Sequence, residues 1–186
     1  FHDKQYDAVT VSDIVKACKI PRGSFYQYFE DKFDAFMMLL EVIKDMKMLY
    51  LKDYTHALGK EPLLYIYSDL VKGGLAFAKD HPKLYSLGMM LFSSQSEAVQ
   101  KVLSEMENMS ITMLQDLLKV DVAHGLIRDD VDTYTIAKML YNLNAKDIVY
   151  EVMQGKNHDE VVSLIEKVLE IIKYGVVKGR DDENNI

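Results

Sequence analysis

One stretch of the chain, from Val9 to Lys32, constrains its fold more than any other. It reads VTVSDIVKACKIPRGSFYQYFEDK and contains two short helical patterns separated by a tight turn. Thr10 or Ser12 can cap the first helix through a hydroxyl group, and Asp13 suits the positive end of the helix dipole. Apolar residues recur along this helix at steps of three and four, at Val11, Ile14, Val15 and Cys18. The stretch therefore predicts a short amphipathic helix, with Cys18, the single cysteine, buried on its apolar side.

The second helical pattern follows Ile20, which we expect to fill the corner between the two helices. Pro21 has the fixed φ that suits the start of a helix. Phe25 and Phe29 lie four residues apart and are expected to anchor its inner face. The outward and flanking positions carry residues that suit contacts with bases or phosphates, namely Arg22, Gly23, Ser24, Tyr26, Gln27 and Tyr28. This is the layout of a helix-turn-helix, whose second helix enters the major groove of DNA.

A third and longer helix is predicted to begin after Asp31, which can cap it. Lys32 lies in its first turn and is expected to bind a backbone phosphate. The candidate DNA-binding residues are therefore Thr10, Ser12, Arg22, Gly23, Ser24, Tyr26, Gln27, Tyr28 and Lys32.

The N-terminal stretch resembles the TetR family (TetR/AcrR type) of bacterial transcriptional regulators. The resemblance rests on Thr10, Asp13, Ile14, the run RGSFYQYF from Arg22 to Phe29, and Lys32. It implies an all-α fold, in which an N-terminal helix-turn-helix DNA-binding domain is joined by a long helix to a larger helical domain for ligand binding and dimerisation. We place the DNA-binding domain at residues 1–46 and the ligand-binding and dimerisation domain at residues 47–186.

Two features depart from the family pattern. Lys19 stands where the family usually has glycine in the turn, so this lysine is expected to adopt a left-handed conformation at some cost. The chain also opens at Phe1 without most of the family's first helix, which resembles a truncation and is expected to weaken the core of the DNA-binding domain.

The rest of the chain is predicted to be helical, because no strand-like alternation and no internal repeat persists. Glycine, proline and capping residues divide it into helices over about 32–55, 62–80, 82–92, 97–124, 132–154 and 158–178.

The net charge of −7 is opposite to the basic balance that favours non-specific phosphate binding. Even within residues 1–33 the basic and acidic side chains are equal in number. The basic ones are Lys4, Lys16, Lys19, Arg22 and Lys32, and the acidic ones are Asp3, Asp7, Asp13, Glu30 and Asp31. The composition therefore favours specific operator binding by a few well-placed cations over general coating of DNA.

Several function classes are disfavoured by what the sequence lacks. The five histidines are scattered, and there is no metal-ligand spacing and no glycine-rich phosphate loop, so we expect neither an enzyme, a metal site nor a cofactor. No apolar run is long enough to span a bilayer, and the start shown does not resemble a signal peptide. We therefore expect a cytoplasmic protein without a membrane partner.

Methionines and tyrosines are abundant in the helical remainder, and methionine lines adaptable apolar pockets well. They are equally suited to filling a core. The family resemblance favours a pocket for a small apolar or aromatic ligand, with the candidate lining residues Tyr65, Tyr85, Met89, Met90, Phe92, Met106, Met109, Met113, Tyr141 and Asn144.

The apolar arc of residues 158–178 is too wide for a helix packed on one side only. A second packing partner is implied, and the family's dimers suggest another copy of the chain, although a monomer with a buried terminal helix is the alternative. The candidate dimer-interface residues are Ile136, Met139, Leu140, Leu143, Leu164, Ile165, Val168 and Ile172.

These features together predict a ligand-responsive homodimer that binds a palindromic operator on double-stranded DNA, most simply as a repressor released by its ligand. The same linkage also allows a co-repressor or an activator. A helical ligand-binding dimer without DNA-binding activity and a protein-interaction module are the competing hypotheses.

Overall fold

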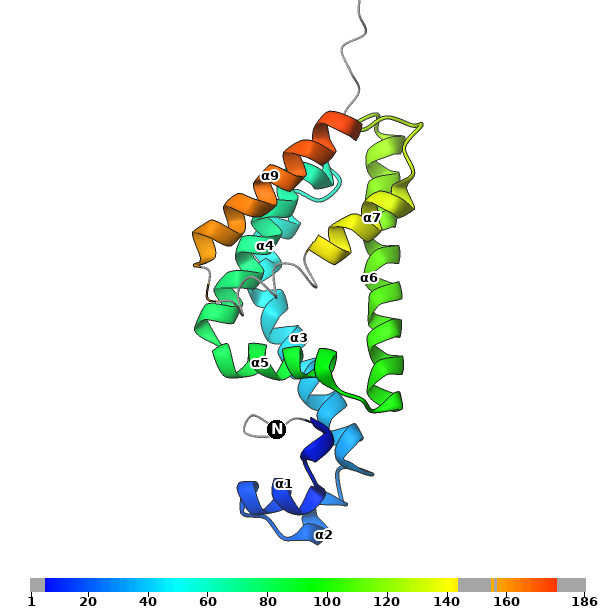
Figure 1. Cartoon of the computed structure of the whole chain (residues 1–186). Coiled ribbons are helices and arrows are strands. Elements are labelled where there is room, and N and C mark those ends of the chain that lie inside the picture. Colours follow the sequence, from blue (N-terminus) through cyan, green and yellow to red (C-terminus); the bar gives the residue numbers. More distant parts are fainter. Residues whose placement is uncertain (1–5, 144–154, 156, 177–186) are drawn as a thin grey trace, which may run out of the picture. The chain divides into compact units, whose positions relative to one another are not determined.

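The computed structural model describes residues 6–143, 155 and 157–176 of the 186-residue chain. Within those residues the chain is helical and forms no strand beyond an isolated bridge (Figure 1). Two 3-10 turns, η1 (Tyr6–Ala8) and η2 (Leu91–Ser93), accompany the α-helices, which are α1 (Val11–Cys18), α2 (Arg22–Phe25), α3 (Lys32–Thr55), α4 (Leu63–Asp80), α5 (Pro82–Met90), α6 (Glu97–Ala123), α7 (Thr133–Asn142) and α9 (His158–Val176). The prediction of an all-α fold is confirmed.

The chain divides into two compact units. Unit 1 contains Phe1–Tyr50 and Ala76–Glu105, and unit 2 contains Leu51–Leu75 and Met106–Ile186. The segment with α5 and the start of α6 thus belongs with the N-terminal helices, although the predicted domains divide the chain once, after residue 46. That division concerns function, and it stays a prediction.

Unit 1 is held by two clusters of buried side chains. In the first, Tyr6 packs on Phe36 with ring centroids 4.8 Å apart, together with Leu91 and Val99. The second joins the middle of α3 to α4 and α5 through Ile43, Phe77 and Leu87. At its edge the Tyr50 hydroxyl donates to Asp80 Oδ2 at 3.0 Å and lies 3.1 Å from His81 Nε2.

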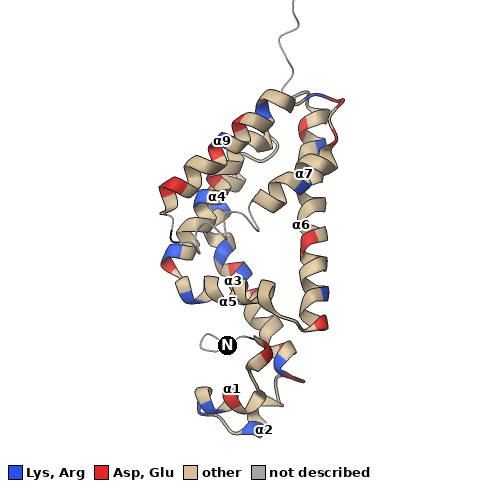
Figure 2. Ribbon diagram, in the orientation of Figure 1, with Lys and Arg blue, Asp and Glu red and all other residues tan. Residues whose placement is uncertain are grey.

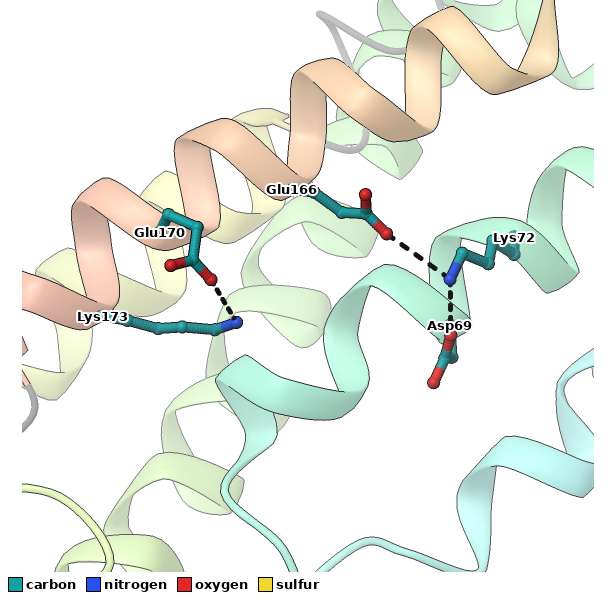
Figure 3. A network of polar contacts seen from close by, with 5 residues as sticks. All are labelled: Asp69, Lys72, Glu166, Glu170 and Lys173. Carbon is teal, nitrogen blue, oxygen red and sulfur yellow. Dashed lines mark hydrogen bonds and ion pairs between the residues drawn. The ribbon is translucent and has the colours of Figure 1, made fainter.

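Unit 2 buries apolar faces of α4, α6, α7 and α9 in one larger cluster. The buried Tyr67 hydroxyl on α4 donates to the carbonyl of Leu140 on α7 at 2.6 Å. An ion pair also joins α4 to α9, because Lys72 of α4 lies 3.5 Å from Glu166, and the same ammonium lies 2.9 Å from Asp69 on its own helix (Figure 3). These charged side chains are 42–51% exposed, so each pair contributes less than about 1 kcal/mol and the apolar cluster dominates.

The buried Asp121 of α6 stabilises the start of α4. Its Oδ2 accepts from the backbone N–H of Leu63, the first residue of α4, at 2.7 Å. Only 2% of Asp121 is exposed, and this burial raises the pKa of its carboxyl group, while the hydrogen bond from Leu63 and the charge of His124 oppose the shift. The carboxylate therefore satisfies an otherwise unpaired helix N–H, but ionising it costs desolvation.

Lys19 adopts the left-handed conformation that the sequence predicts, with φ 54° and ψ 40°. It is the single non-glycine residue with positive φ in the described part of the chain. Its N–H donates to the carbonyl of Lys16 at 3.3 Å, and that of Ile20 donates to Val15 at 3.0 Å, which closes α1. The helix ends here at the cost of a strained lysine.

Two predictions about this turn are wrong. Cys18 is exposed, and Ile20 keeps 39% of its surface exposed and does not fill the corner. The apolar stripe of α1 is half-covered at Val11, Ile14 and Val15 and no longer covered at its end. Within the described residues, no helix is long and apolar enough to cross a membrane.

Replacing Lys19 with glycine should stabilise the protein by roughly 0.5–1 kcal/mol, because glycine adopts positive φ without a Cβ clash. Lys16→Gly makes the same chemical change inside α1 and should destabilise it by about 1 kcal/mol. Urea denaturation of both variants measures the difference. A loss of stability in Lys19→Gly would contradict the assignment of strain.

Replacing Asp121 with alanine should lower the free energy of unfolding by roughly 1–3 kcal/mol, because the Leu63 N–H is left buried without an acceptor. Asp121→Asn keeps the acceptor and should retain most of that stability. Since the folded-state pKa is raised, wild-type stability should fall as pH rises from about 4 through that pKa, and Asp121→Asn should remove this fall. Denaturation across pH 4–8 tests both points, and equal curves for wild type and Asp121→Asn would refute the second.

Candidate nucleic-acid interface

The start of α1 is fixed by a reciprocal cap. Thr10 Oγ1 accepts from the backbone N–H of Asp13 at 3.1 Å, and the N–H of Thr10 donates to Asp13 Oδ2 at 3.0 Å. The Thr10 hydroxyl also donates to the same carboxylate at 2.7 Å. Of the two capping residues left open by the sequence, Thr10 is the one used. Its hydroxyl proton is therefore engaged within α1 and is not available to DNA.

The segment after the turn presents polar and aromatic side chains to solvent. Phe25 is 1% exposed and its ring lies 5.3 Å from that of Phe29, so both phenylalanines anchor this segment as predicted. On the outside, Tyr26 is 48% and Tyr28 78% exposed. Gly23 and Gln27 are also exposed, and Ser24 is half-buried.

Arg22 links α1 to α2 at this surface. Its Nη1 donates to Ser12 Oγ at 3.3 Å, and its Nη2 donates to the Tyr26 hydroxyl at 3.2 Å. The guanidinium carbon also lies 5.7 Å from the centroid of the Tyr26 ring. A guanidinium has five N–H donors, so donors remain for a base or a phosphate while the group is already oriented.

Lys32 does not have the role that the sequence predicted. Its ammonium donates to the carbonyls of Tyr6 at 3.0 Å, Asp7 at 3.3 Å and Val9 at 2.9 Å, and it lies 4.5 Å from the centroid of the Tyr6 ring. An ammonium has three donors, and all three are used within the chain. The predicted phosphate contact is therefore corrected to an internal one that joins η1 to α3.

The charged residues of the N-terminal segment are distributed more favourably for phosphate binding than the even balance over residues 1–33 implies. Residues 14–29 carry Lys16, Lys19 and Arg22, all exposed, and no acidic side chain. Figure 2 shows basic residues at α1 and α2, together with an acidic residue on α1, which is Asp13 in its first turn. The turn and the recognition segment thus form a small basic surface suited to phosphate groups.

A second set of contacts, which we call the clasp, joins η1 to the corner before α6. Asp7 Oδ2 accepts from the backbone N–H of Gln95 at 2.7 Å, and Asp7 Oδ1 accepts from the hydroxyl of the buried Ser94 at 2.8 Å. The hydrogen bonds from Gln95 and Ser94 lower the pKa of Asp7. Sequence reasoning did not identify the clasp, because no local signal pairs residues 87 positions apart.

The candidate ligand-lining residues in unit 1 lie on α5 and η2. Tyr85, Met89 and Met90 are half-buried, and burial raises the pKa of the Tyr85 phenol. Phe92 is 45% exposed.

The candidates in unit 2 are less enclosed. Met106, Met109 and Met113 lie on an exposed face of α6, where the latter two border an open groove of about 630 Å³. That these three methionines line a ligand pocket stays a prediction. Tyr65 is half exposed, with Lys173 Nζ 4.7 Å from its ring centroid, and Tyr141 is half-buried with its pKa raised by burial and by Glu107. Asn144 lies outside the described residues.

The candidate dimer-interface residues divide into two groups. Most are buried within the core of unit 2, namely Ile136, Leu140, Leu143, Ile165 and Ile172, while Val168 is partly buried against it. Met139 and Leu164 remain 48% and 37% exposed, and Ile171 is 74% exposed. Their contact with another copy stays a prediction. Among the described residues, no group of three histidine, cysteine or acidic side chains is placed to hold a metal ion.

Comparison with known proteins identifies relatives of both the N-terminal segment and the whole chain. Residues 1–34 match the family model of bacterial regulatory proteins, tetR family. The transcriptional regulator AcuR of Cereibacter sphaeroides is 46% identical over 39 residues, which span 21% of this chain and 18% of that protein. The fatty acid metabolism regulator protein of Bacillus subtilis is 24% identical over 176 residues, 92% of this chain and 87% of that protein.

The same fold occurs in a solved structure, that of the transcriptional regulator FadR from Bacillus subtilis in complex with stearoyl-CoA. It superposes with a TM-score of 0.68 at 17% identity and covers 90% of this chain and 88% of that one. The family match falls on the segment that contains the cap, the left-handed turn and the whole tyrosine-rich run from Arg22 to Phe29. Residues 1–34 thus match the tetR family model, and the chain shares its fold with this solved regulator over most of its length.

Proposed function

We propose that this chain is a repressor that binds a near-palindromic operator as a homodimer and releases it when a ligand with an apolar chain binds. The observation that carries the proposal is the exposed, already oriented array of Arg22 and Tyr26, with Tyr28 beside it in a segment, residues 14–29, that has no acidic side chain. The relatives named above are regulators, which supports regulation over catalysis as the function.

Arg22 is the residue we assign to base recognition. Bidentate contact with guanine needs a planar fork of donors, and the contacts with Ser12 and Tyr26 reduce the side-chain freedom that binding would otherwise remove. Tyr28 is the most exposed of the tyrosines in this segment, and we assign its hydroxyl to a phosphate or base edge. Gly23 lacks a side chain, so the backbone of α2 can approach the duplex closely.

Dimerisation is assigned to the second apolar face of α9. Val161, Ile165 and Leu169 pack within unit 2, whereas Leu164 and Ile171 remain exposed on the same helix. A helix with apolar residues on two faces is explained by a partner on the open face. A twofold dimer would present two recognition segments to half-sites roughly 34–36 Å apart.

The ligand class is inferred from the relatives and from α5. One relative is a fatty acid metabolism regulator, and the FadR structure contains stearoyl-CoA. The half-buried methionines of α5 suit an acyl chain, since methionine adapts to irregular apolar surfaces. We therefore propose an acyl compound as the ligand.

The clasp supplies a route from ligand to DNA. Ser94 and Gln95 directly precede α6, and Asp7 directly precedes the helix-turn-helix. A ligand that binds better when the start of α6 is in a different position would, through the clasp, shift η1. The shift of η1 would then displace the recognition segment.

Selection from a random duplex pool should enrich a near-palindrome, and Arg22→Ala should weaken binding to it by roughly 10- to 100-fold. Arg22→Lys, which keeps the charge but loses the fork, should lose sequence preference more than affinity. Tyr28→Phe should weaken binding, whereas Tyr134→Phe, the same change at an exposed site on α7, should not. Fluorescence anisotropy measures all four. No enrichment at low salt would favour a ligand-binding dimer without DNA-binding activity.

Breaking the clasp should uncouple ligand binding from operator binding. In Ser94→Ala, the effect of stearoyl-CoA on operator affinity should decrease by roughly 0.5–2 kcal/mol, while the affinity for stearoyl-CoA alone changes little. Ser96→Ala is the matched control, because only the backbone N–H of Ser96 contacts Ser94. Operator titrations with and without stearoyl-CoA give the coupling free energy. An unchanged value in Ser94→Ala would refute this route.

A further inference from the structure

Helix α6 exposes a row of apolar side chains in unit 2, which we call the methionine stripe. Met106, Met109, Met113 and Val120 recur at steps of three, four and seven residues, so they share one side of the helix. Their exposed fractions are 46%, 72%, 60% and 40%. Another side of α6 is buried in the core of unit 2, where Leu118 is 0% exposed. The helix is therefore apolar on two sides, and the described residues cover only one of them.

A groove of about 630 Å³ lies along this stripe. Its lining residues are Asn108, Met109, Thr112, Met113, Asp116, Leu117 and Val120. All of them belong to α6, so within the described residues the groove has no opposite wall. A small-molecule site buries most of its ligand's surface, which a single helix does not do. A second helix, in contrast, can pack its side chains into such a groove along its length.

The charges beside the stripe cancel. Lys119 Nζ lies 2.9 Å from Asp116 Oδ1, and both side chains are more than half exposed. The other polar residues that line the groove, Asn108 and Thr112, are uncharged. This face therefore offers little electrostatic attraction to a nucleic acid, an anionic membrane or a strongly basic peptide. It is also free of the net repulsion that keeps identical charged surfaces apart.

An antiparallel copy of α6 is complementary to the stripe when a twofold axis passes close to Thr112. Positions at about equal distances before and after this residue then face each other. Met109 comes against Met113 of the second copy, and the Asn108 amide can donate to the Asp116 carboxylate of that copy. Each contact occurs twice, because a twofold interface brings the same surface of both copies together.

We propose that the methionine stripe is a self-association surface, on which α6 of a second copy packs antiparallel. This contact is separate from the dimer proposed above through α9, and where both form they join four copies into a tetramer. The stripe from Met106 to Val120 extends over about 22 Å of helix, which is small for a stable interface. The association through α6 should therefore be weak, in the micromolar range.

Sedimentation velocity at concentrations up to roughly 100 μM measures the assembly. Met109→Glu places a carboxylate against an apolar side chain of the second copy and should reduce the tetramer to a dimer. Ile171→Glu, on the exposed face of α9, should also leave a dimer, and the double variant should be a monomer. Met48→Glu changes an exposed methionine of α3 and is the matched control, with the behaviour of wild type.

Polar and cysteine variants test the register. Asn108→Lys should tighten the association by roughly two- to tenfold through ion pairs with Asp116 of the second copy, and Asn108→Asp should weaken it by a similar factor. In a Cys18→Ser background, Thr112→Cys lies near the twofold axis and should form a disulfide between copies under mild oxidation. Lys119→Cys should not, because its counterpart lies about 21 Å away along the helix axis.

Three results would overturn the inference. Wild type and Met109→Glu could have the same size, in which case the size of Ile171→Glu still judges the α9 dimer separately. Lys119→Cys could cross-link more readily than Thr112→Cys, which excludes the antiparallel packing. Met109→Glu could instead weaken stearoyl-CoA binding without changing the assembly, which would assign the stripe to a ligand site. Position 109 is 72% exposed, so the melting temperature of Met109→Glu should match wild type and unfolding would not explain a lost contact.

Discussion

The N-terminal part of unit 1 depends on the hydrogen bonds that the Lys32 ammonium donates. At the start of α3 this ammonium donates to the carbonyls of Tyr6, Asp7 and Val9. Such charge-assisted hydrogen bonds are stronger than neutral ones. The same short turn is held on another side by its own side chains, since Tyr6 packs on Phe36 and Asp7 accepts from Gln95. The position of α1 relative to α3 therefore follows from one lysine and three residues around η1.

Features set by neighbouring residues could be predicted from the sequence. Thr10 and Asp13 are three positions apart, which is the spacing of a reciprocal helix cap, and the cap forms. Lys19 stands at the position that needs a left-handed residue, and it adopts that conformation. Phe25 and Phe29 lie one helical turn apart and anchor the segment between them. Most helix boundaries agree closely for the same reason, because caps, glycines and prolines act locally. The helix predicted over 132–154 is the exception, since α7 ends at Asn142 and residues 144–154 lie outside the described part of the chain.

Features set by distant residues could not be predicted in this way. Lys32 reaches carbonyls 23–26 residues earlier in the chain, and a residue in the first turn of a helix carries no sign of such a partner. Periodicity places Met106, Met109 and Met113 on one face of α6 but does not say whether that face is covered. On α9, adjacent Leu164 and Ile165 both belong to the wide apolar arc, yet Ile165 is buried and Leu164 is not. Choosing between them requires the tertiary structure.

The charge distribution explains why accurate placement matters for this chain. A net charge of −7 opposes DNA in most orientations, and residues 14–29 supply three exposed cations with no acid among them. The affinity gained by releasing counterions grows with the number of phosphates neutralised, so three cations supply only modest non-specific binding. Sequence-specific affinity must then come from a few oriented groups such as Arg22, whose geometry is set by Ser12 and Tyr26. A densely basic protein would tolerate a small displacement of its recognition segment, whereas one that relies on a few oriented contacts loses them together. If the proposed operator binding relies on these contacts, a small shift of η1 would be enough to weaken it.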